Sequence, residues 1–288
     1  MIVTLKEILK IAEEKQFAVG SFNTPNLESL RAVMEAAEEL KLPVIVQFAQ
    51  CHEIYEPLEV MGPVMVALAK RASVPVCVHL DHGETLDYLD RALEMGFTSV
   101  MYDGSVLPYE ENMENTKRTA AMAAKTGASV EAELGSMGRR ESGAGDRSGE
   151  EDDTKIYTDP VLAGAFVKET KVDALACSFG TTHGIYLTRP KLDFSVVERV
   201  RRETGGVPVV MHGGSGVSQE GFHAAIRAGV RKINYFTYMD KAGGAAVAQW
   251  AASLEKGAPA FYADAAAAAE KAMKENVKEA MRTFAFMD

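Results

Sequence analysis

The feature that most constrains the fold is a regular alternation of short β-rich runs with longer amphipathic stretches. Eight strands, each followed by a helix, predict a (β/α)8 TIM barrel. The strand candidates are 17–23, 43–50, 75–80, 98–103, 129–134, 173–179, 208–212 and 230–235, and clear helical stretches are 26–40, 87–96, 110–127 and 195–205. An open doubly wound sheet is the alternative, but the first strand candidate is followed by no Gly-rich dinucleotide turn.

The chain of 288 residues suits one barrel domain over 1–288, since such barrels typically take about 250 residues. One segment, 135–157, interrupts the alternation because it is glycine-rich, charged and long for a strand–helix connection. It follows the fifth strand candidate, and we interpret it either as a surface insertion or as a mobile lid over an active site. The tail from 257 to 286 is expected to form C-terminal helices.

Composition excludes several classes of partner. The net charge of −10 and a pI of about 5.2 argue against nucleic acid, although a small phosphorylated substrate needs only a local cluster of donors. No run approaches the ~20 apolar residues of a membrane span, and a cytoplasmic protein is expected. The three cysteines, Cys51, Cys77 and Cys177, are interpreted as buried free thiols.

Polar side chains collect at the ends of the strand candidates, where barrel enzymes place their chemistry. These residues are Asn23, Asp81, His82, Asp103, Glu133, His183, His212 and Asn234. Three of them are histidines on three different strand ends, and together they could supply the protein ligands of a catalytic zinc with an open position for substrate. The other histidines, His52, His79 and His223, are given structural roles.

Glycine-rich sequence follows the seventh strand candidate in "HGGSG" (212–216), and "NYFT" (234–237) ends the eighth. These two loops form the usual phosphate site of barrel enzymes. Backbone N–H groups of Gly213 and Gly214, with the hydroxyls of Ser215 and Thr237, can converge on an anion there. Asp81, beside His82, is either an acid/base group or a carboxylate that orients a metal-binding histidine.

Between residues 18 and 238 the chain resembles the class II, zinc-dependent ketose-bisphosphate aldolases, which include the fructose- and tagatose-bisphosphate enzymes. The resemblance rests on an ordered set of motifs: "GSFNTPNLESLRAVMEAAEE", "HLDHG", "YDGSVLPYEEN", "VEAELG", "GTTHGIY", "MHGGSGV" and "KINYFT". It implies reversible cleavage of a ketose 1,6-bisphosphate to dihydroxyacetone phosphate and an aldehyde such as glyceraldehyde 3-phosphate. It also implies a homodimer or homotetramer.

The resemblance also assigns roles to individual residues. His82, His183 and His212 would bind Zn²⁺, Asp81 would exchange a proton with the C4 oxygen, and Asp103 and Glu133 match positions that can hold a second or displaced divalent ion. A glutamate of the 148–153 loop, Glu150 or Glu151 with Glu141 as a competitor, would move the C3 proton. A monovalent cation is expected near the phosphate. The residues expected to bind substrate are Asn23, Gly184, Gly213, Gly214, Ser215, Asn234, Tyr235, Phe236 and Thr237. Asn234 is also expected to be a catalytic residue.

Departures from the family pattern leave other functions open. Tyr235, Phe236 and Tyr238 put aromatic rings where the family usually has smaller or acidic residues, and Val106-Leu107 replaces a version of the motif that contains histidine. An aldolase for another ketose phosphate or for a phospho-sugar acid is therefore an alternative. A Schiff-base aldolase that uses Lys232 and a barrel that has lost its activity are two more, and neither explains why three histidines and Asp81 lie at strand ends.

Overall fold

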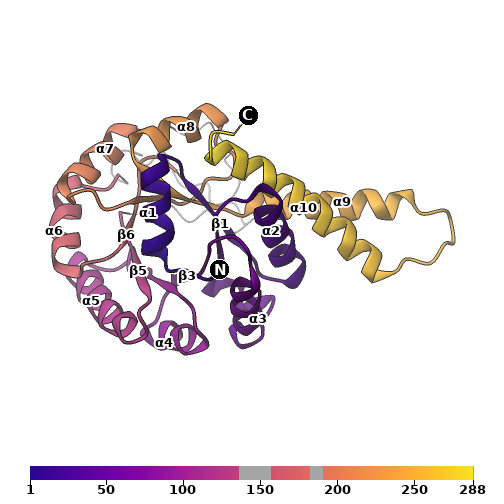
Figure 1. Cartoon of the computed structure of the whole chain (residues 1–288), viewed down its shortest axis with the longest axis horizontal. Helices are drawn as coiled ribbons and strands as arrows, with labels where there is room; N and C mark the ends of the chain where they lie inside the picture. Colours follow the sequence, from indigo (N-terminus) through magenta and orange to yellow (C-terminus); the bar gives the residue numbers. More distant parts are fainter. Residues whose placement is uncertain (136–156, 182–190, 288) are drawn as a thin grey trace, which may run out of the picture.

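The computed structural model of the protein describes residues 1–135, 157–181 and 191–287. Within these ranges eight parallel strands close into a barrel in sequential order, with helices around it (Figure 1). The strands are β1 (Val19–Asn23), β2 (Val44–Ala49), β3 (Val76–Gly83), β4 (Ser99–Tyr102), β5 (Ser129–Leu134), β6 (Ala174–Cys177), β7 (Val209–Met211) and β8 (Val230–Tyr235). The predicted (β/α)8 barrel is confirmed.

The surrounding helices begin at residues that suit helix N-termini. Side chains of Asn26, Thr85, Asp159 and Ser218 each accept a hydrogen bond from a backbone N–H in the first turn that follows. The helices are α2 (Leu27–Leu40), α3 (Leu58–Arg71), α4 (Leu86–Met95), α5 (Tyr109–Thr126), α6 (Pro160–Thr170), α7 (Phe194–Glu203) and α8 (Gln219–Ala228), and a short 3₁₀ helix, η1 (Gln50–Ile54), follows β2. Each helix buries one apolar stripe against the outside of the barrel.

The predicted strand centres agree with the structure, and the ends of three strands differ by more than one residue. The first strand begins at Val19 and not at residue 17. The third strand continues through Asp81, His82 and Gly83, beyond the predicted end at residue 80, because a register shift lets it follow β4 further. The sixth strand is shorter than predicted and covers only Ala174–Cys177. Apart from its end residues, the proposed lid segment at 135–157 lies outside the described residues.

Inward-facing residues of the barrel change character along its axis. Toward the amino ends of the strands they are apolar, as in Val19, Ile45, Cys77 and Val210. In the middle and upper layers they are buried and polar: Ser21, Gln47, His79, Ser99, Glu131, Lys232, Asp81, Glu133, His212 and Asn234. The polar end coincides with the carboxyl ends of the strands, where the candidate site lies.

Helix α1 (Leu5–Lys15) closes the apolar end of the barrel and lies over its middle in Figure 1. Its buried face, formed by Leu5, Ile8, Leu9 and Ala12, packs on the apolar inner layer. A capping box starts the helix, since Thr4 and Glu7 each accept a hydrogen bond from the other's backbone N–H. Among the described residues, α1 thus covers the amino ends of the strands and leaves the polar end as the place for a site.

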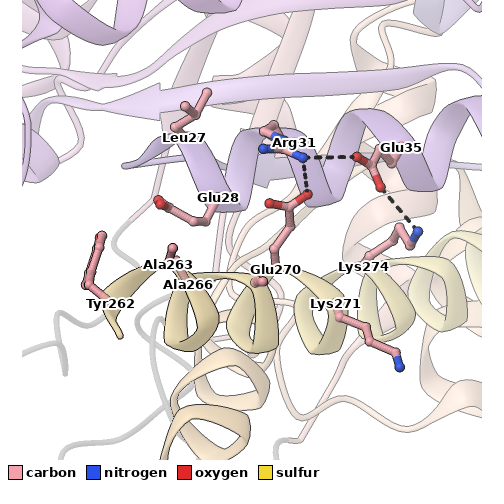
Figure 2. Close-up of a pocket in the computed structure, with 11 residues that line it drawn as sticks. Leu27, Glu28, Arg31, Glu35, Tyr262, Ala263, Ala266, Glu270, Lys271 and Lys274 are labelled. Carbon is pink, nitrogen blue, oxygen red and sulfur yellow. Dashed lines mark hydrogen bonds and ion pairs between the residues drawn. The ribbon is translucent and has the colours of Figure 1, made fainter. Parts of the chain in front are cut away.

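Two long helices, α9 (Thr237–Ser253) and α10 (Tyr262–Phe284), follow β8 and extend beyond the barrel (Figure 1). A pocket of about 440 Å³ lies between α10 and α2. Figure 2 shows that its charged side chains pair across the gap: Arg31 with Glu270 at 3.1 Å and Lys274 with Glu35 at 3.2 Å. These pairs join α10 to the barrel. No helix in the described ranges is long and apolar enough to cross a membrane.

Candidate active site

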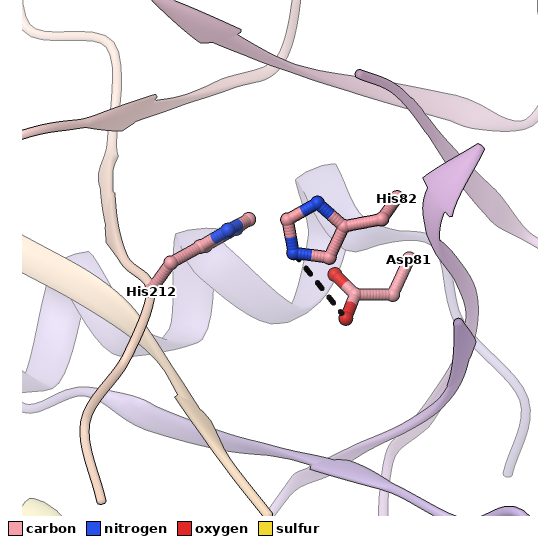
Figure 3. Close-up of side chains that lie close together, drawn as sticks. All are labelled: Asp81, His82 and His212. Atoms are coloured by element: carbon pink, nitrogen blue, oxygen red, sulfur yellow. Dashed lines mark ion pairs between the residues drawn. The ribbon is translucent and has the colours of Figure 1, made fainter. Parts of the chain in front are cut away.

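A bulge at the end of β3 places two consecutive side chains in one site. In a regular strand Asp81 and His82 would point to opposite faces. Here the pairing of β3 with β4 shifts between Leu80 and Gly83, and His82 adopts a left-handed backbone with φ of 46°. Asp81 can therefore point into the barrel while the His82 ring lies 4.8 Å from the ring of His212 at the end of β7 (Figure 3).

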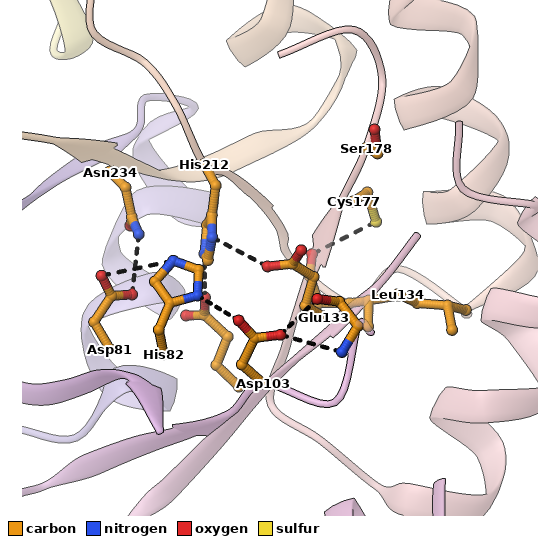
Figure 4. Close-up of polar contacts among 12 residues, drawn as sticks. Asp81, His82, Asp103, Glu133, Leu134, Cys177, Ser178, His212 and Asn234 are labelled. Carbon is orange, nitrogen blue, oxygen red and sulfur yellow. Dashed lines mark hydrogen bonds and ion pairs between the residues drawn. The ribbon is translucent and has the colours of Figure 1, made fainter. Parts of the chain in front are cut away.

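Each of these two imidazoles is oriented by a carboxylate. His82 Nδ1 is 2.7 Å from Asp103 Oδ2, and His212 Nε2 is 2.9 Å from Glu131 Oε1. Glu133 Oε2 lies 3.3 Å from the other nitrogen of His212 (Figure 4). Carboxylates of this kind fix the ring orientation and raise the basicity of metal-binding histidines.

The donor atoms fit one divalent metal ion. Two overlapping groups, Asp81–His82–His212 and His82–Asp103–Glu133, have ligand atoms that all lie within 4.8 Å of one another. Atoms bound to one ion at about 2.0–2.2 Å can be at most about 4.4 Å apart, so a small side-chain movement completes the coordination. Imidazole and carboxylate donors suit zinc and its neighbours in the first transition row.

Electrostatics agree with a cation at this place. Burial alone would lower the pKa of His82, but Asp81, Asp103 and Glu133 raise it to about 10. Burial alone would raise the pKa of Asp81, yet the charges of His82 and Lys232 hold it well below its ordinary value. The cluster of carboxylates thus attracts positive charge, and Asp81 is a carboxylate at neutral pH.

The Asp81 carboxylate is held by two amide groups. Gln47 Nε2 donates to Oδ2 and Asn234 Nδ2 donates to Oδ1, each at 3.1 Å. Ser21 donates in turn to the Gln47 side-chain oxygen. Because a carboxylate only accepts, these contacts fix both amides with their oxygens turned away from Asp81. The Asn234 oxygen is buried and has no hydrogen-bond partner among the described residues.

The sequence analysis missed a layer of polar residues directly below this cluster. Glu131 Oε2 forms an ion pair with Lys232 Nζ at 2.8 Å, Glu131 Oε1 lies 2.9 Å from His212 Nε2, and His79 Nδ1 contacts Ser99 Oγ at 2.8 Å. The alternation of side chains along a strand could have predicted two inward-facing polar residues. Gln47 in "VIVQFA" and Glu131 in "SVEAEL" both occupy inward positions of otherwise apolar strands. The structural role predicted for His79 is consistent with its complete burial.

The loops after β7 and β8 lie side by side. The backbone N–H of Gly214 donates to the Asn234 carbonyl at 3.2 Å, and a Cβ on Gly214 would lie 2.8 Å from that oxygen. Ser215 is buried beside them, and Thr237 is the first residue of α9. A helix N-terminus and a glycine loop therefore converge, which is an arrangement that can bind a phosphate.

The Tyr235 side chain turns away from the expected phosphate site, and the expectation for one cysteine is wrong. The Tyr235 ring packs between Phe22 and Phe284, at 6.0 and 6.1 Å, on the outer side of the barrel, because side chains alternate along β8 and Asn234 points inward. Its side chain therefore does not line the phosphate site. Cys51 is exposed in η1, so the thiol is not buried as expected, whereas Cys77 and Cys177 are.

Five of the residues expected in the site lie outside the described ranges: His183, Gly184, Glu141, Glu150 and Glu151. The residues that the structure does bring to the mouth come from β1, β3, β4, β5, β7 and β8. They are Asn23, Asp81, His82, Asp103, Glu133, His212 and Asn234.

Comparison with known proteins agrees with this geometry. Residues 3–288 match the family described as class II fructose-bisphosphate aldolase. The chain is 37% identical over 296 residues to a probable fructose-bisphosphate aldolase of Bacillus subtilis, with 98% of this chain and 97% of the relative covered. It is 40% identical over 248 residues to the fructose-bisphosphate aldolase of Geobacillus stearothermophilus, covering 82% and 81%. The crystal structure of the YdjI aldolase from Escherichia coli K12 superposes with a TM-score of 0.85 at 34% identity, covering 99% and 97%.

Proposed function

The chain belongs to the class II fructose-bisphosphate aldolase family and is an aldolase lyase, and on that basis we propose that it reversibly cleaves a ketose 1,6-bisphosphate of the fructose or tagatose type. The products would be dihydroxyacetone phosphate and an aldehyde such as glyceraldehyde 3-phosphate. The observation that carries the proposal is the cluster of Asp81, His82 and His212 at the carboxyl ends of β3 and β7.

Class II aldolases depend on a divalent metal ion, and we propose zinc as that ion here. His82 and His212, with His183 from outside the described residues, would hold it, and Asp103 and Glu133 would orient these ligands or hold a second ion. When bound, the ion supplies a Lewis acid for the substrate's ketone carbonyl. A monovalent cation near the phosphate is a further part of the proposal.

Asp81 is proposed as the proton carrier. Its carboxylate accepts the proton of the C4 hydroxyl as the C3–C4 bond breaks, and it returns that proton to the aldehyde oxygen in condensation. Gln47 and Asn234 hold the carboxylate in one orientation through both of its oxygens. The buried oxygen of Asn234 can accept a hydrogen bond from a substrate hydroxyl. A loop glutamate, Glu150 or Glu151 with Glu141 as competitor, is proposed to move the C3 proton.

The dihydroxyacetone phosphate half would bind at the loops after β7 and β8. Gly213, the hydroxyls of Ser215 and Thr237, and the backbone from Asn234 to Phe236 would surround the phosphate, with Gly184 beside them. The N–H of Gly214 already donates to the Asn234 carbonyl, so this glycine would serve by keeping the loop close to β8. Asn23 at the end of β1 would contact the other half of the sugar. A homodimer or homotetramer remains a prediction.

The experiment that tests this function is a coupled assay of triose-phosphate release from fructose 1,6-bisphosphate and tagatose 1,6-bisphosphate. Release from either sugar is expected, and the ratio of the two kcat/KM values ranks the C4 epimers. If neither sugar is cleaved while dihydroxyacetone phosphate still exchanges its C3 proton with solvent, the reaction class stands and the sugar is a different ketose phosphate or phospho-sugar acid. Absence of both activities would contradict the proposal and favour the non-catalytic alternative.

A Schiff-base mechanism through Lys232 is the alternative that uses a different chemistry. Such a lysine must be free to attack a carbonyl, whereas Lys232 is fully buried and its Nζ is held in an ion pair with Glu131 at 2.8 Å. Borohydride in the presence of dihydroxyacetone phosphate is therefore expected to leave activity intact. Inactivation with a substrate-derived mass on Lys232 would support the alternative.

A further inference from the structure

One histidine near the site has a buried ring nitrogen with no hydrogen-bond partner among the described residues. His52 lies in η1, directly after β2, and its side chain is 7% exposed. Its ring contacts are aromatic: Phe236 at 4.9 Å, Tyr55 at 5.9 Å and Phe48 at 6.3 Å. Nδ1 is buried and makes no hydrogen bond to any described residue. Leaving such a nitrogen unpaired costs about 1–3 kcal/mol, and a native structure that retains one usually has a partner for it at another stage.

The contacts of His52 place its ring at the mouth of the barrel. It comes from the loop after β2 and packs on Phe236 from the loop after β8, and β1 is the strand between them. The ring therefore bridges the carboxyl end of β1, where Asn23 also has a buried oxygen without a partner among the described residues. The charged groups that act on His52 are Asp81 and His82, so the ring lies near the candidate site.

This position corresponds to one half of the proposed substrate. The phosphate is assigned to the loops after β7 and β8, and Asp81 to the C4 oxygen. The Asp81 carboxylate lies between Gln47 on β2 and Asn234 on β8, which donate to its two oxygens, so the C4 oxygen is assigned to this part of the mouth. Carbons beyond C4, which leave as the aldehyde, then extend over the ends of β1 and β2, where Asn23 and His52 have unpaired polar atoms.

We propose that His52 is a specificity-determining residue that hydrogen-bonds a hydroxyl group of the aldehyde half of the sugar, an inference that rests on the proposed aldolase function. Burial lowers the pKa of His52, so the ring is neutral and offers one donor and one acceptor. That pair of groups matches a hydroxyl, which both donates and accepts. Phe236 and Phe48 pack against the ring and fix its position, so its nitrogens are held ready for a substrate hydroxyl.

The test is condensation of dihydroxyacetone phosphate with two aldehydes of equal carbon number: glyceraldehyde, which carries hydroxyls, and propionaldehyde, which carries none. In His52→Phe, which keeps an aromatic ring and removes the nitrogens, the glyceraldehyde-to-propionaldehyde ratio of kcat/KM is expected to fall by about 10–100-fold. His52→Asn, which restores a polar group near the position of Nδ1, should recover part of that ratio. His223→Phe, a substitution of a histidine on the outer helix α8, is the matched control and should leave the ratio unchanged.

Two measurements separate the failure of this inference from other failures. Deuterium exchange at C3 of dihydroxyacetone phosphate needs no aldehyde, so wild-type exchange shows that the proposed reaction class holds. Absence of both exchange and condensation would overturn both proposals. If the wild type exchanges and the ratio in His52→Phe equals that of the wild type, the role of His52 alone is overturned. A loss of the same size for both aldehydes and for exchange would also overturn it, since His52 would then only support the fold, and the thermal unfolding midpoints of both variants would report that.

Discussion

At the scale of single residues, the candidate site depends on the backbone at His82. A left-handed conformation is unfavourable for a residue with a Cβ and persists only where the surrounding structure imposes it. Here the imidazole is fixed by Asp103 on one nitrogen and lies against His212, and the next residue is a glycine. The strained backbone lies where two adjacent side chains have the proposed roles of metal ligand and proton carrier.

Asp81 is expected to act chemically and not as a metal ligand alone. Asp81→Asn keeps the size of the side chain but cannot accept the C4 proton, so kcat for cleavage should fall by about 10²–10⁴-fold. Zinc content, measured by mass spectrometry of the purified protein, should stay near that of the wild type because the histidines remain. The exposed Asp90→Asn on α4 is the matched control. An unchanged kcat in Asp81→Asn would remove Asp81 from the mechanism.

At the scale of secondary-structure elements, β3 and α4 must approach closely for the bulge to form. A Cβ on Gly83 would lie 2.4 Å from Leu89 Cδ1 and 2.9 Å from the Met101 carbonyl oxygen. Gly83→Ala should therefore push the bulge away from α4 and destabilise the protein by about 1–3 kcal/mol. Denaturant unfolding would measure the loss. Equal stability of Gly83→Ala and the wild type would show that the bulge tolerates a side chain.

Helix α1 is held to the barrel by a cluster of ion pairs. Glu13 accepts two hydrogen bonds from Arg201, at 2.7 and 3.1 Å, and one from Arg231 at 2.8 Å. Partial burial alone would raise the pKa of Glu13, but these arginines lower it below its ordinary value of 4.5. A carboxyl whose pKa is lowered on folding adds stability above its unfolded pKa and loses it as the pH falls through the folded value.

Glu13→Gln should therefore reduce the free energy of unfolding near neutral pH and have little effect in acid. The carboxylate is 38% exposed and screened by solvent, so the loss should be below about 1 kcal/mol at pH 7. Urea unfolding of both proteins from pH 7 down to about pH 3 would show the difference shrinking below pH 4.5. The exposed Glu14→Gln is the matched control. A difference that is constant across this range would rule out the ion pairs as its source.

At the scale of the whole molecule, periodicity and strand-end chemistry predict the barrel and most of the mouth. Apolar runs such as "VIVQFA" predict strands that are buried on both faces. The polar residues at the carboxyl ends of the strands predict where the site lies. The bulge could not be predicted, because its left-handed backbone is at a histidine and follows from packing against α4. The outward direction of the Tyr235 side chain and the position of the His52 ring also depend on contacts between segments that are distant in the sequence. Such contacts cannot be predicted from the sequence pattern.

The interior of the barrel has three layers along its axis. Apolar residues and α1 close one end, a buried polar layer around Glu131 and Lys232 fills the middle, and histidines with carboxylates line the open end. Charges in a buried interior interact strongly and must be paired. The residues of the polar layer pair with one another and also orient the histidines and carboxylates above them. The fold thus holds together, before substrate binds, the groups that we propose as metal ligands and proton carrier.

The most direct test of this account is the release of triose phosphate from fructose and tagatose 1,6-bisphosphates by the wild-type protein, before and after chelator treatment and after zinc is added back. We predict that the chelator abolishes release, that zinc restores it, and that zinc content and activity return in proportion. Activity that survives complete removal of the metal would contradict the account and turn attention to Lys232.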